Sequence, residues 1–584
     1  MTIRWDALFA RGRHGEMERL ARVATGDDPE DGTGWKMLGL AIMLQGRFGE
    51  ALPALRHALA RLPGESEIHA YLGITLRALG RMEEAEGCYR AALECQPDYA
   101  EAHNNLGNLL RETGRLDEAE VSYHLALKHK PDYADACYNL GGLLTLKGRF
   151  VEAERACRHL LALRPDCVEA LNNLAVLLQN RGGFDEAEAC YRRALELDPG
   201  GADMWCNLGK LLHRRHRFVA AGEMYRQTIA LQPEHADAWY NYGVLLQGLK
   251  RFAEAETAYR EVLRLGPGRE DARWNLGVLY LSSGRFGEGW PLHEARDTPN
   301  NRTWREMLSV NGFVPWQGEA LAGKSLLIIP EQGYGDQIQF CRYVPLLKSL
   351  GVLELSVVCA APLAPVLTTL AGVDRLLVAE EVEEIPWHDY WVFSLSIPWR
   401  LGTTLETIPA EIPYLHPLPE RVAHWAWIVH RPGLRVGLVW KGSAEHKNDA
   451  HRSLAGLEIL SPLWSVPGIS FFGLQKAEGE VFPDSPVMQL GEGLRDFADT
   501  AAVMSHLDLV ISIDSAVAHL AGALGKPCWV LVPHWETDWR WLQERNDSPW
   551  YPDRMRLFRQ TRLEEWDPVV RQVAEALARQ CVVP

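Results

Sequence analysis

The stretch VISIDSAVAHLAGALGKPCWVLVP, residues 510–533, decides the fold of the C-terminal half of the chain. An apolar strand ends at Ile513, Asp514 and Ser515 follow abruptly, and a helix of small residues runs to a Gly-Lys-Pro break before a second apolar strand. A strand, a helix and another strand in this order indicate a parallel sheet covered by helices.

The residues after the first strand predict an anion site. Asp514 and Ser515 are residues of the N-cap type, and the small Ala516 and Val517 behind them leave backbone N–H groups accessible. Those N–H groups, together with the helix dipole, suit a phosphate or a diphosphate. An ordinary capped helix is the alternative interpretation of the same residues.

The same alternation extends outward from this stretch and predicts two doubly wound lobes, at 324–430 and 431–584. The predicted strands are 324–330, 353–362, 373–379, 434–440, 469–475, 507–513 and 527–533, and the predicted helices include 337–351, 362–372 and 497–507. Ligands of such folds bind outside the carboxyl ends of the strands. The sequence has no G-x-G-x-x-G after a first strand and no phosphate loop, which weakens the case for a dehydrogenase or an ATPase.

A second candidate site follows the strand at 324–330. The turn EQGYGDQ places Gly335 and Asp336 at the mouth of the first lobe, where a carboxylate can reach a hydroxyl across the cleft. Asp336 is therefore a candidate general base. Its alternative role is that of a turn residue bonded to its own backbone.

The N-terminal half is a 34-residue repeat. Small residues, an alanine, a tyrosine and a proline recur at this spacing, and the prolines are Pro29, Pro63, Pro97, Pro131, Pro165, Pro199, Pro233 and Pro267. Each unit reads as two helices joined by a turn that is often Gly-Arg. The pattern resembles the tetratricopeptide repeat and predicts an all-α superhelical array of about eight repeats over 1–296, with a degenerate first unit and a linker at 297–323.

One asparagine per repeat forms a ladder along the first helix of the pair: Asn105, Asn139, Asn173, Asn207, Asn241 and Asn275. Asparagine is a poor helix former, so a role other than local stability is expected. Its amide can bind the main chain of an extended peptide, or it can bond to a neighbouring repeat. The first interpretation predicts a protein acceptor in the groove, and the array is similar to that of eukaryotic O-GlcNAc transferases.

The C-terminal motifs resemble those of heptosyltransferase-like glycosyltransferases. The string DSAVAHLAGALGKP from Asp514 matches their donor-site signature, and the turn GYGD that ends at Asp336 matches that of their acceptor lobe. Over about 320–575 the resemblance implies a GT-B fold of two Rossmann-like lobes. A second set of segments is similar to bacterial proteins that join tetratricopeptide repeats to such a domain, flagellin glycosyltransferases among them. These segments are 331–347, 446–453, 498–527 and 538–560.

The resemblance also implies roles for individual residues. Arg452 would supply a cation for the leaving phosphate, and His519 would either contact the donor or simply be packed. The further candidate donor-binding residues are Gly335, Trp440, Lys441, Gln475, Lys476, Asp514, Ser515, Ala516 and Val517. Lys441 stands where a small residue is expected, and both it and Lys476 are either functional or solvated surface residues. The aromatic stretch that opens the 538–560 segment either covers the donor or anchors the last helix.

Composition limits the partners and the compartment. The 584 residues are 47% hydrophobic with a formal net charge of -16, which argues against broad nucleic-acid or anionic-membrane binding. No apolar run of spanning length is present, and the eleven cysteines lack paired spacing. A cytoplasmic protein is expected, without a metal or cofactor, and its self-association as a homo-oligomer through the repeats is left open.

These features predict a metal-independent, inverting protein O-glycosyltransferase. It would move a sugar from a nucleotide sugar to Ser or Thr of a polypeptide, and the resemblance makes flagellin a plausible acceptor. One alternative is an enzyme that glycosylates lipopolysaccharide core or another glycan. The other alternative is a repeat scaffold with an inactive GT-B domain. The sequence determines neither the sugar nor the nucleotide.

Overall fold

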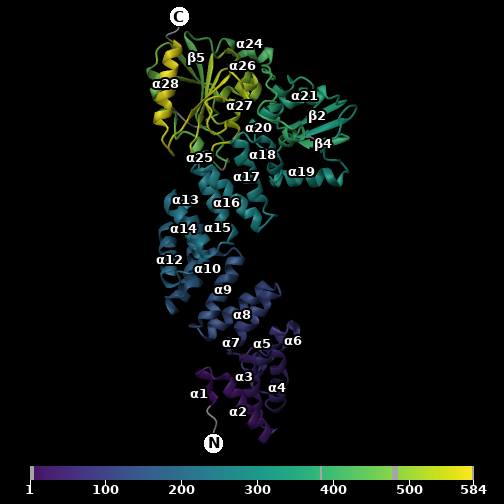
Figure 1. The fold of residues 1–584 in the computed structure, drawn as a ribbon, viewed down its shortest axis with the longest axis vertical. Helices are drawn as coiled ribbons and strands as arrows, with labels where there is room; N and C mark the ends of the chain where they lie inside the picture. Colours follow the sequence, from purple (N-terminus) through teal and green to yellow (C-terminus); the bar gives the residue numbers. More distant parts are fainter. Residues whose placement is uncertain (1–4, 297, 382–383, 447, 477–484, 582–584) are drawn as a thin grey trace. The chain divides into compact units, whose positions relative to one another are not determined.

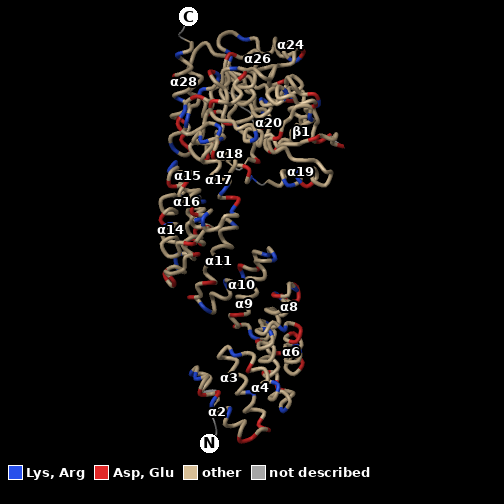
Figure 2. Tube along the Cα trace, turned by 45° about the vertical axis from the view of Figure 1, so that its right-hand side comes forward, with Lys and Arg blue, Asp and Glu red and all other residues tan. Residues whose placement is uncertain are grey.

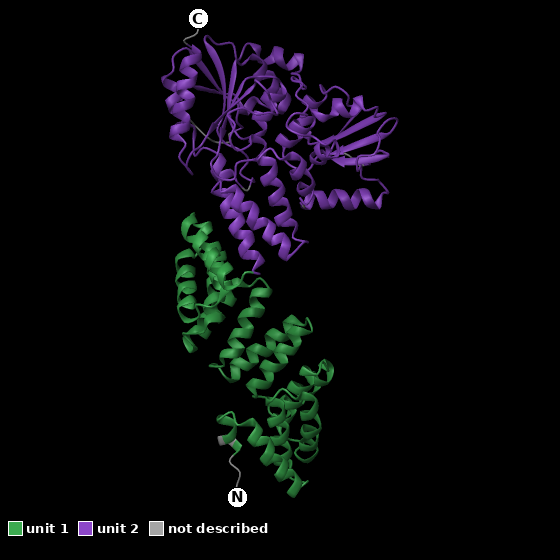
Figure 3. Cartoon of the chain, in the orientation of Figure 1, with its two compact units in different colours: residues 1–233 green, residues 234–584 purple. Residues whose placement is uncertain are grey.

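The computed structural model describes residues 5–296, 298–381, 384–446, 448–476 and 485–581, and it divides into two compact units, Met1–Pro233 and Glu234–Pro584 (Figure 3). Unit 1 is helical. Unit 2 holds the last helices of the repeat array and two parallel sheets. The predicted fold class, a helical repeat array followed by two α/β lobes, is confirmed.

Unit 1 is built from helices that pair along the chain, and tight turns separate the members of a pair. Glycines with positive φ occupy several of these turns, for example Gly80 and Gly114 at φ 76° and 79°, where a residue with a Cβ would be strained. The helices are α1 (Trp5–Ala10), α2 (His14–Asp27), α3 (Gly32–Leu44), α4 (Phe48–Arg61), α5 (Ser66–Ala78), α6 (Met82–Cys95), α7 (Ala100–Glu112), α8 (Leu116–His129), α9 (Ala134–Leu146), α10 (Phe150–Leu163), α11 (Val168–Asn180), α12 (Phe184–Leu197), α13 (Ala202–Arg214) and α14 (Phe218–Leu231).

The recurring small residue and the recurring tyrosine are one packing device. A Cβ placed on Gly107 would lie 2.6 Å from Cε1 of Tyr123, whose ring is fully buried. Only a residue without a side chain lets the two helices of this repeat close over the ring. In the next repeat Cys157 takes the place of the tyrosine, and a Cβ on Gly141 would meet its Sγ at an ordinary 3.6 Å.

This difference between repeats predicts opposite effects of the same substitution. Gly107→Ala should destabilise the array by about 1–3 kcal/mol, because the methyl group overpacks against Tyr123. Gly141→Ala should be neutral or stabilising by up to about 1 kcal/mol, because the site has room and alanine favours the helix. Urea unfolding followed by circular dichroism measures both, and equal midpoints for the two variants would contradict the packing account.

Charged side chains reinforce the stacking of repeats, and Figure 2 shows both signs interspersed along the chain. The Arg115 side chain pairs with Glu118 of its own repeat at 2.6 Å and with Glu86 of the preceding repeat at 2.8 Å. The same pattern recurs at Arg47, Arg149 and Arg285. Exposed pairs of this kind contribute little individually, so we expect them to affect the register of the repeats more than their stability.

In unit 2 the last repeat helices are continuous with the lobes. Trp290 is buried, and its indole N–H donates to the carbonyl of Thr403 at 2.9 Å, so the array ends inside the hydrophobic core of the C-terminal half. These helices are α15 (Ala236–Gly248), α16 (Phe252–Leu265), α17 (Glu270–Ser282) and α18 (Phe286–His293), followed by α19 (Pro299–Val310).

The first lobe has a four-stranded parallel sheet in the order β3-β2-β1-β4. Its elements are β1 (Ser325–Ile329), α20 (Tyr334–Phe340), α21 (Tyr343–Ser349), β2 (Glu354–Cys359), η1 (Ala361–Leu363), α22 (Ala364–Leu367), β3 (Arg375–Val378), β4 (Tyr390–Phe393), η2 (Ser394–Ser396) and α23 (Ile397–Arg400). The single helix predicted at 337–351 is wrong, since the chain forms α20 and α21 there. Pro345 explains the break between Phe340 and Tyr343. It has no N–H to donate to the carbonyl four residues earlier, so the helical hydrogen bonds cannot continue from α20 into α21.

The second lobe has a six-stranded parallel sheet in the order β10-β9-β8-β5-β6-β7. The direction of winding reverses between β5 and β8, and doubly wound sheets bind their ligands in the crevice at that point. The elements are α24 (Pro419–Ala426), β5 (Leu434–Val439), α25 (Asp449–Arg452), η3 (Leu457–Ser465), β6 (Ile469–Gly473), β7 (Val487–Gln489), η4 (Gly491–Gly493), α26 (Phe497–His506), β8 (Leu509–Ile513), α27 (Ala516–Ala523), β9 (Cys528–Val532), η5 (Trp539–Trp541), β10 (Met555–Arg559) and α28 (Asp567–Cys581).

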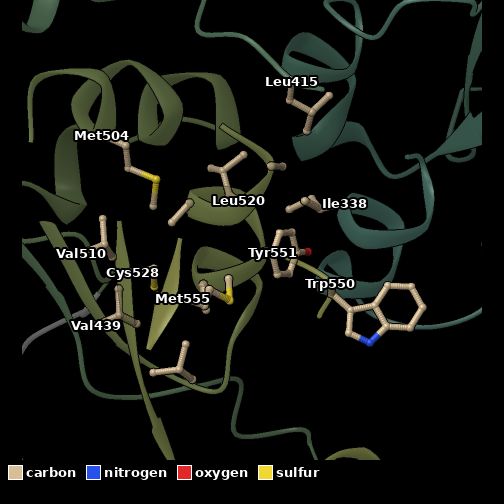
Figure 4. Close-up of a cluster of buried hydrophobic side chains, with 14 of the residues drawn as sticks. Ile338, Leu415, Val439, Met504, Val510, Leu520, Cys528, Trp550, Tyr551 and Met555 are labelled. Carbon is tan, nitrogen blue, oxygen red and sulfur yellow. The ribbon is translucent and has the colours of Figure 1, made fainter. Parts of the chain in front are cut away.

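The core around α27 joins the two lobes. Figure 4 shows Leu520 of α27 and Tyr551 close to Ile338 of α20, and all three side chains are buried. Figure 1 places α20 next to α27, and the two helices are in contact. Within the described ranges no helix has the length and apolar character needed to cross a bilayer.

Candidate active site

The crevice of the second lobe lies where β8 gives way to α27. Ser515 is the N-cap residue, with φ -154° and ψ 167°, but its side chain caps no backbone N–H and instead bonds to the Ser512 hydroxyl at 2.9 Å. In the described part of the chain, no hydrogen bond occupies the N–H groups of Ala516 and Val517. Residues 514–517 are all half-buried, so these donors are accessible to an anion.

Gly335 brings the first lobe directly against the start of this helix. A Cβ on Gly335 would lie 2.9 Å from Cδ2 of His519 and 3.4 Å from Cα of Ala516. A side chain at this position would therefore push the two lobes apart. The structure thus brings the predicted acceptor-lobe turn and the predicted donor helix into one site.

Asp336 faces the second lobe and forms an ion pair with Arg540 there. Arg540 is only 4% exposed, and its Nε–H donates to Gln339 Oε1 at 2.6 Å. One Nη donates to the two oxygens of Asp538 at 3.0 and 2.9 Å, and the other donates to Asp336. One guanidinium therefore links groups of both lobes at the base of the crevice.

Sequence reasoning missed Arg540 and Asp538. They lie in the aromatic stretch that opens the 538–560 segment, whose role the sequence left open between donor cover and anchor. The available signal was that an Asp and an Arg alternate with tryptophans in this stretch. Charged residues inside an apolar stretch are buried only when they are paired, so this pattern indicates a buried ion pair.

Burial and neighbouring charges shift the pKa values of the three carboxyl groups. Burial raises the pKa of Asp336, the Arg540 charge opposes the shift, and Asp538 adds to it. Burial and the Asp538 charge raise the pKa of Asp514 to about 7, against the opposing charges of Arg452 and Arg540. For Asp538, burial favours the neutral form, but the Arg540 charge and hydrogen bonds outweigh it and lower its pKa.

His519 is packed. Its Nδ1 lies 3.0 Å from the Tyr551 hydroxyl, and its ring stacks on Trp541 with centroids 5.3 Å apart. Burial, with the Arg540 charge, lowers the pKa of His519 to about 3, so the ring is neutral. Of the two roles that the sequence allowed, the geometry favours the packed side chain.

The other donor-site candidates divide into near and remote residues. Arg452 is near, since its charge acts on Asp514, and its Nε–H donates to Asp449 at 3.2 Å. Gln475 accepts the N–H of Lys441 at 2.8 Å, so it braces the end of β5. Lys476 is exposed and donates to the carbonyl of Arg495 at 3.0 Å.

Trp440 is the clearest departure from the predicted donor site. Its side chain is fully buried in the hydrophobic core of unit 2. Only its backbone stays at the crevice, where its N–H lies 3.3 Å from Oε1 of Gln475. A large apolar side chain at a strand end is stabilised more by burial in the core than by exposure in a solvated cleft. Lys447, in the segment 446–453, lies outside the described residues.

The asparagine ladder combines inter-repeat bonds with exposure. The side-chain amides of Asn139 and Asn207 donate to the side chains of Asn104 and Asn172 of the preceding repeat, at 2.9 and 3.2 Å. In unit 2, Asn275 donates to the Tyr240 hydroxyl at 3.1 Å and Asn241 to a carbonyl of its own helix. All six residues, Asn105, Asn139, Asn173, Asn207, Asn241 and Asn275, are half-buried. Several therefore have a structural role and still present part of the amide to solvent.

No three His, Cys, Asp or Glu side chains converge on a metal-binding geometry in the ranges that the structure describes. The groups that line the crevice are carboxylates, guanidinium groups and backbone N–H donors. A carboxylate opposite a row of N–H groups can take up a proton on one side of the crevice while a leaving anion is held on the other.

Comparison with known families agrees with this division of the chain. Family models of the tetratricopeptide repeat match residues 6–66, 43–109, 110–175, 168–200, 215–270 and 245–289. The model of glycosyltransferase family 9 (heptosyltransferase) matches residues 493–531, which contain α26, β8 and α27.

A curated relative is Protein FlbA of Caulobacter vibrioides, which is 32% identical over 317 residues, 50% of this chain and 52% of its own length. The chain thus spans about half the length of the curated relative that it matches.

The solved structure of YrrB, described as a TPR protein with an unusual peptide-binding site, is 26% identical with a TM-score of 0.30 and covers 32% of this chain and 95% of its own. That of PilF from Pseudomonas aeruginosa is 21% identical with a TM-score of 0.33 and covers 36% and 95%. The chain accordingly contains tetratricopeptide repeats, and residues 493–531 of its C-terminal half are similar to glycosyltransferase family 9.

Proposed function

We propose that the protein is a glycosyltransferase that moves a sugar from a nucleotide-sugar donor to a Ser or Thr hydroxyl of a polypeptide held by its repeats. The observation that carries the proposal is the meeting of Asp336 with the open N-terminus of α27 through Gly335. One site then offers a proton acceptor and an anion cradle at a short distance from each other.

In the proposed reaction the acceptor oxygen attacks the anomeric carbon of the donor sugar. The bond from that carbon to the phosphate oxygen breaks, and the leaving nucleotide keeps the electron pair. The hydroxyl proton passes to Asp336, and because burial raises the pKa of this group, its carboxylate is a stronger base than an exposed one. The N–H groups of Ala516 and Val517, with Arg452, would bind the negative charge that develops on the phosphate.

The donor half of this proposal predicts the effect of a single N–H deletion. Ala516 is the first residue of α27, a position where proline is tolerated because its missing N–H has no helical partner. Ala516→Pro should weaken nucleotide-sugar binding about tenfold to a hundredfold, the cost of one hydrogen bond to a charged group. Ala516→Gly keeps the N–H and is the matched control.

The measurement is a panel of UDP-, GDP-, ADP- and CMP-sugars. A sugar nucleotide present at a hundred times its Kd should stabilise the wild-type protein by about 2.7 kcal/mol, seen as a rise in Tm. If no member of the panel raises the Tm, the enzyme proposal fails. If Ala516→Pro binds as tightly as Ala516→Gly, the phosphate lies elsewhere.

The acceptor half rests on the half-exposed ladder amides and on the presence of tetratricopeptide repeats. With the donor identified, labelled sugar is offered to Ser- and Thr-containing peptides, including flagellin peptides, and to lipopolysaccharide core glycans. We expect label on peptides, and a raised KM for them when Asn105 and Asn173 are both changed to Ala. Label on glycans alone would favour the alternative in which the repeats serve assembly.

A further inference from the structure

The segment 535–543 connects the last repeats with the crevice. At its centre, Arg540 has partners on all three nitrogens, because Nε–H bonds to Gln339 and the two Nη groups bond to Asp538 and Asp336. Gln339 and Asp336 belong to α20 of the first lobe, while Arg540 and Asp538 belong to the second. A planar guanidinium fixes its partners in direction as well as in distance, which an ammonium does not do.

The repeat array holds the two ends of this segment. Trp535 is buried against Gly248, the last residue of α15, where an added Cβ would lie 2.3 Å from its ring. At the other end, the Gln543 amide donates to the hydroxyls of Ser282 and Ser283, at 2.8 and 3.1 Å. The segment therefore cannot move without disturbing the helices α15 and α17.

The backbone of the segment is strained at both ends. Glu536 and Leu542 have φ values of 49° and 52°, in a region that residues with a Cβ avoid. Each such residue costs about 1–3 kcal/mol and persists only where surrounding contacts impose it. The contacts with α15 and α17 are of that kind, and they place Arg540 beside Asp336.

We propose that Arg540 is a positioning residue, which aims the Asp336 carboxylate at the acceptor hydroxyl, and that the last repeats hold it in place through the segment 535–543. This inference rests on the proposed function, because it assigns Arg540 a role in that reaction. It adds a part for the repeats: besides presenting an acceptor, they build one wall of the site.

The charged groups that act on Asp336 are Arg540 and Asp538 of the segment 535–543, and Glu331 after β1. Glu331 is itself bound to Arg296. Asp514 and the neutral His519, from the β8–α27 turn and helix, interact with Arg540. Arg452 faces Asp514. Arg540 is thus the cation in direct contact with Asp336, and its removal leaves that carboxyl among other carboxylates.

The test is the pH profile of kcat/KM for hydrolysis of the donor that raises the Tm of the wild-type protein. Arg540→Gln should shift the acid limb upward by at least about one pH unit, because losing the cation raises the pKa of Asp336 and leaves it protonated at higher pH. Activity on the acid limb should then fall about tenfold or more relative to activity on the plateau at higher pH. Arg545→Gln, in an exposed pair with Asp547, is the matched control and should leave the profile unchanged.

Arg540→Lys separates charge from geometry and serves if Arg540→Gln fails to fold. Lysine keeps the positive charge but not the planar guanidinium that donates to three partners at once. The acid limb should therefore stay in place and the donor KM should be unchanged, while kcat falls. An unshifted acid limb in Arg540→Gln, or an unchanged kcat in Arg540→Lys, would overturn the role of Arg540. Failure of the wild-type protein to bind any nucleotide sugar would instead overturn the proposed function.

The part assigned to the repeats has its own pair of variants. Gly248→Ala must displace the Trp535 ring, whereas Gly287→Ala in α18 has open space around it. Gly248→Ala should lower kcat severalfold with an unchanged donor KM, and Gly287→Ala should not. Equal kcat values for the two variants would show that Arg540 is positioned without the repeats.

Discussion

Asp336→Asn is expected to lower the turnover of a nucleotide-sugar donor to a hydroxyl acceptor by about 10²- to 10⁴-fold, the range in which a positioned general base contributes. The amide keeps the size of the carboxylate and accepts the Arg540 hydrogen bond, but it cannot take up the acceptor proton. Donor affinity should stay within about threefold, because the proposed phosphate site at Ala516 and Val517 is untouched.

Stability should change little in this variant, and this separates a catalytic from a structural role. Arg540 retains both oxygens of Asp538 and the Gln339 amide, so it is not left unpaired. Burial disfavours the charged form of Asp336, as its raised pKa indicates, and the neutral amide of asparagine does not carry this unfavourable desolvation free energy. Rates are measured by release of the free nucleotide, with Asp547→Asn as an exposed control. A variant that turns over within threefold of wild type would exclude Asp336 as the base.

The largest effect on stability is expected from Glu331→Ala. The Glu331 side chain is fully buried and accepts hydrogen bonds from Nε of Arg296 at 2.7 Å, from the Asn301 amide at 2.9 Å and from the N–H of Leu395 at 3.0 Å. These partners come from the end of the array, from α19 and from η2, which follows β4. The residue thus fastens the joint between repeats and lobe at the strand end that precedes Asp336.

Removing one partner of a buried ion pair leaves the other charge uncompensated, which costs about 3–5 kcal/mol. Urea unfolding of unit 2, followed by tryptophan fluorescence, should therefore show a large fall in midpoint for Glu331→Ala. Glu354→Ala, in a pair with Arg375 that is exposed, should cost less than about 1 kcal/mol. The double variant with Arg296→Met should lose less than the two single variants together, because the unpaired charge is gone. Additive losses would show that the pair is not coupled.

The repeat array could be read from the sequence because its contacts are short in range. The small residue and the tyrosine of one repeat, such as Gly107 and Tyr123, pack against each other within a single unit, and the unit recurs every 34 residues. Each repeat contacts its neighbours, so the period of the sequence is also the period of the packing. The ladder asparagines were found in the same way, but the sequence left peptide binding and inter-repeat bonding both open, because both roles need the same residue at the same spacing.

The candidate site was only partly predictable. The turn at Gly335 and Asp336 and the helix start at Ser515 stand at strand ends, where the parallel-sheet rule places ligands. The resemblance made Trp440 a donor-binding candidate and left His519 open between donor contact and packing. Both side chains are packed, Trp440 in the core and His519 against Tyr551 and Trp541. Position at a strand end fixes where a backbone is, whereas the direction of a side chain depends on which neighbours offer burial.

By itself the sequence determined the helical repeats, the two parallel-sheet lobes and the two motifs that face each other, because each of these depends on local periodicity or on a short motif. Only the tertiary structure decided that Arg540 joins Asp336, since 204 residues separate them and no spacing rule reaches so far. It also decided that the last repeats contact the segment 535–543, which carries Arg540. The physical reason is that a buried arginine is held by whatever carboxylates the packed lobes bring to it, and that packing is a property of the whole of unit 2.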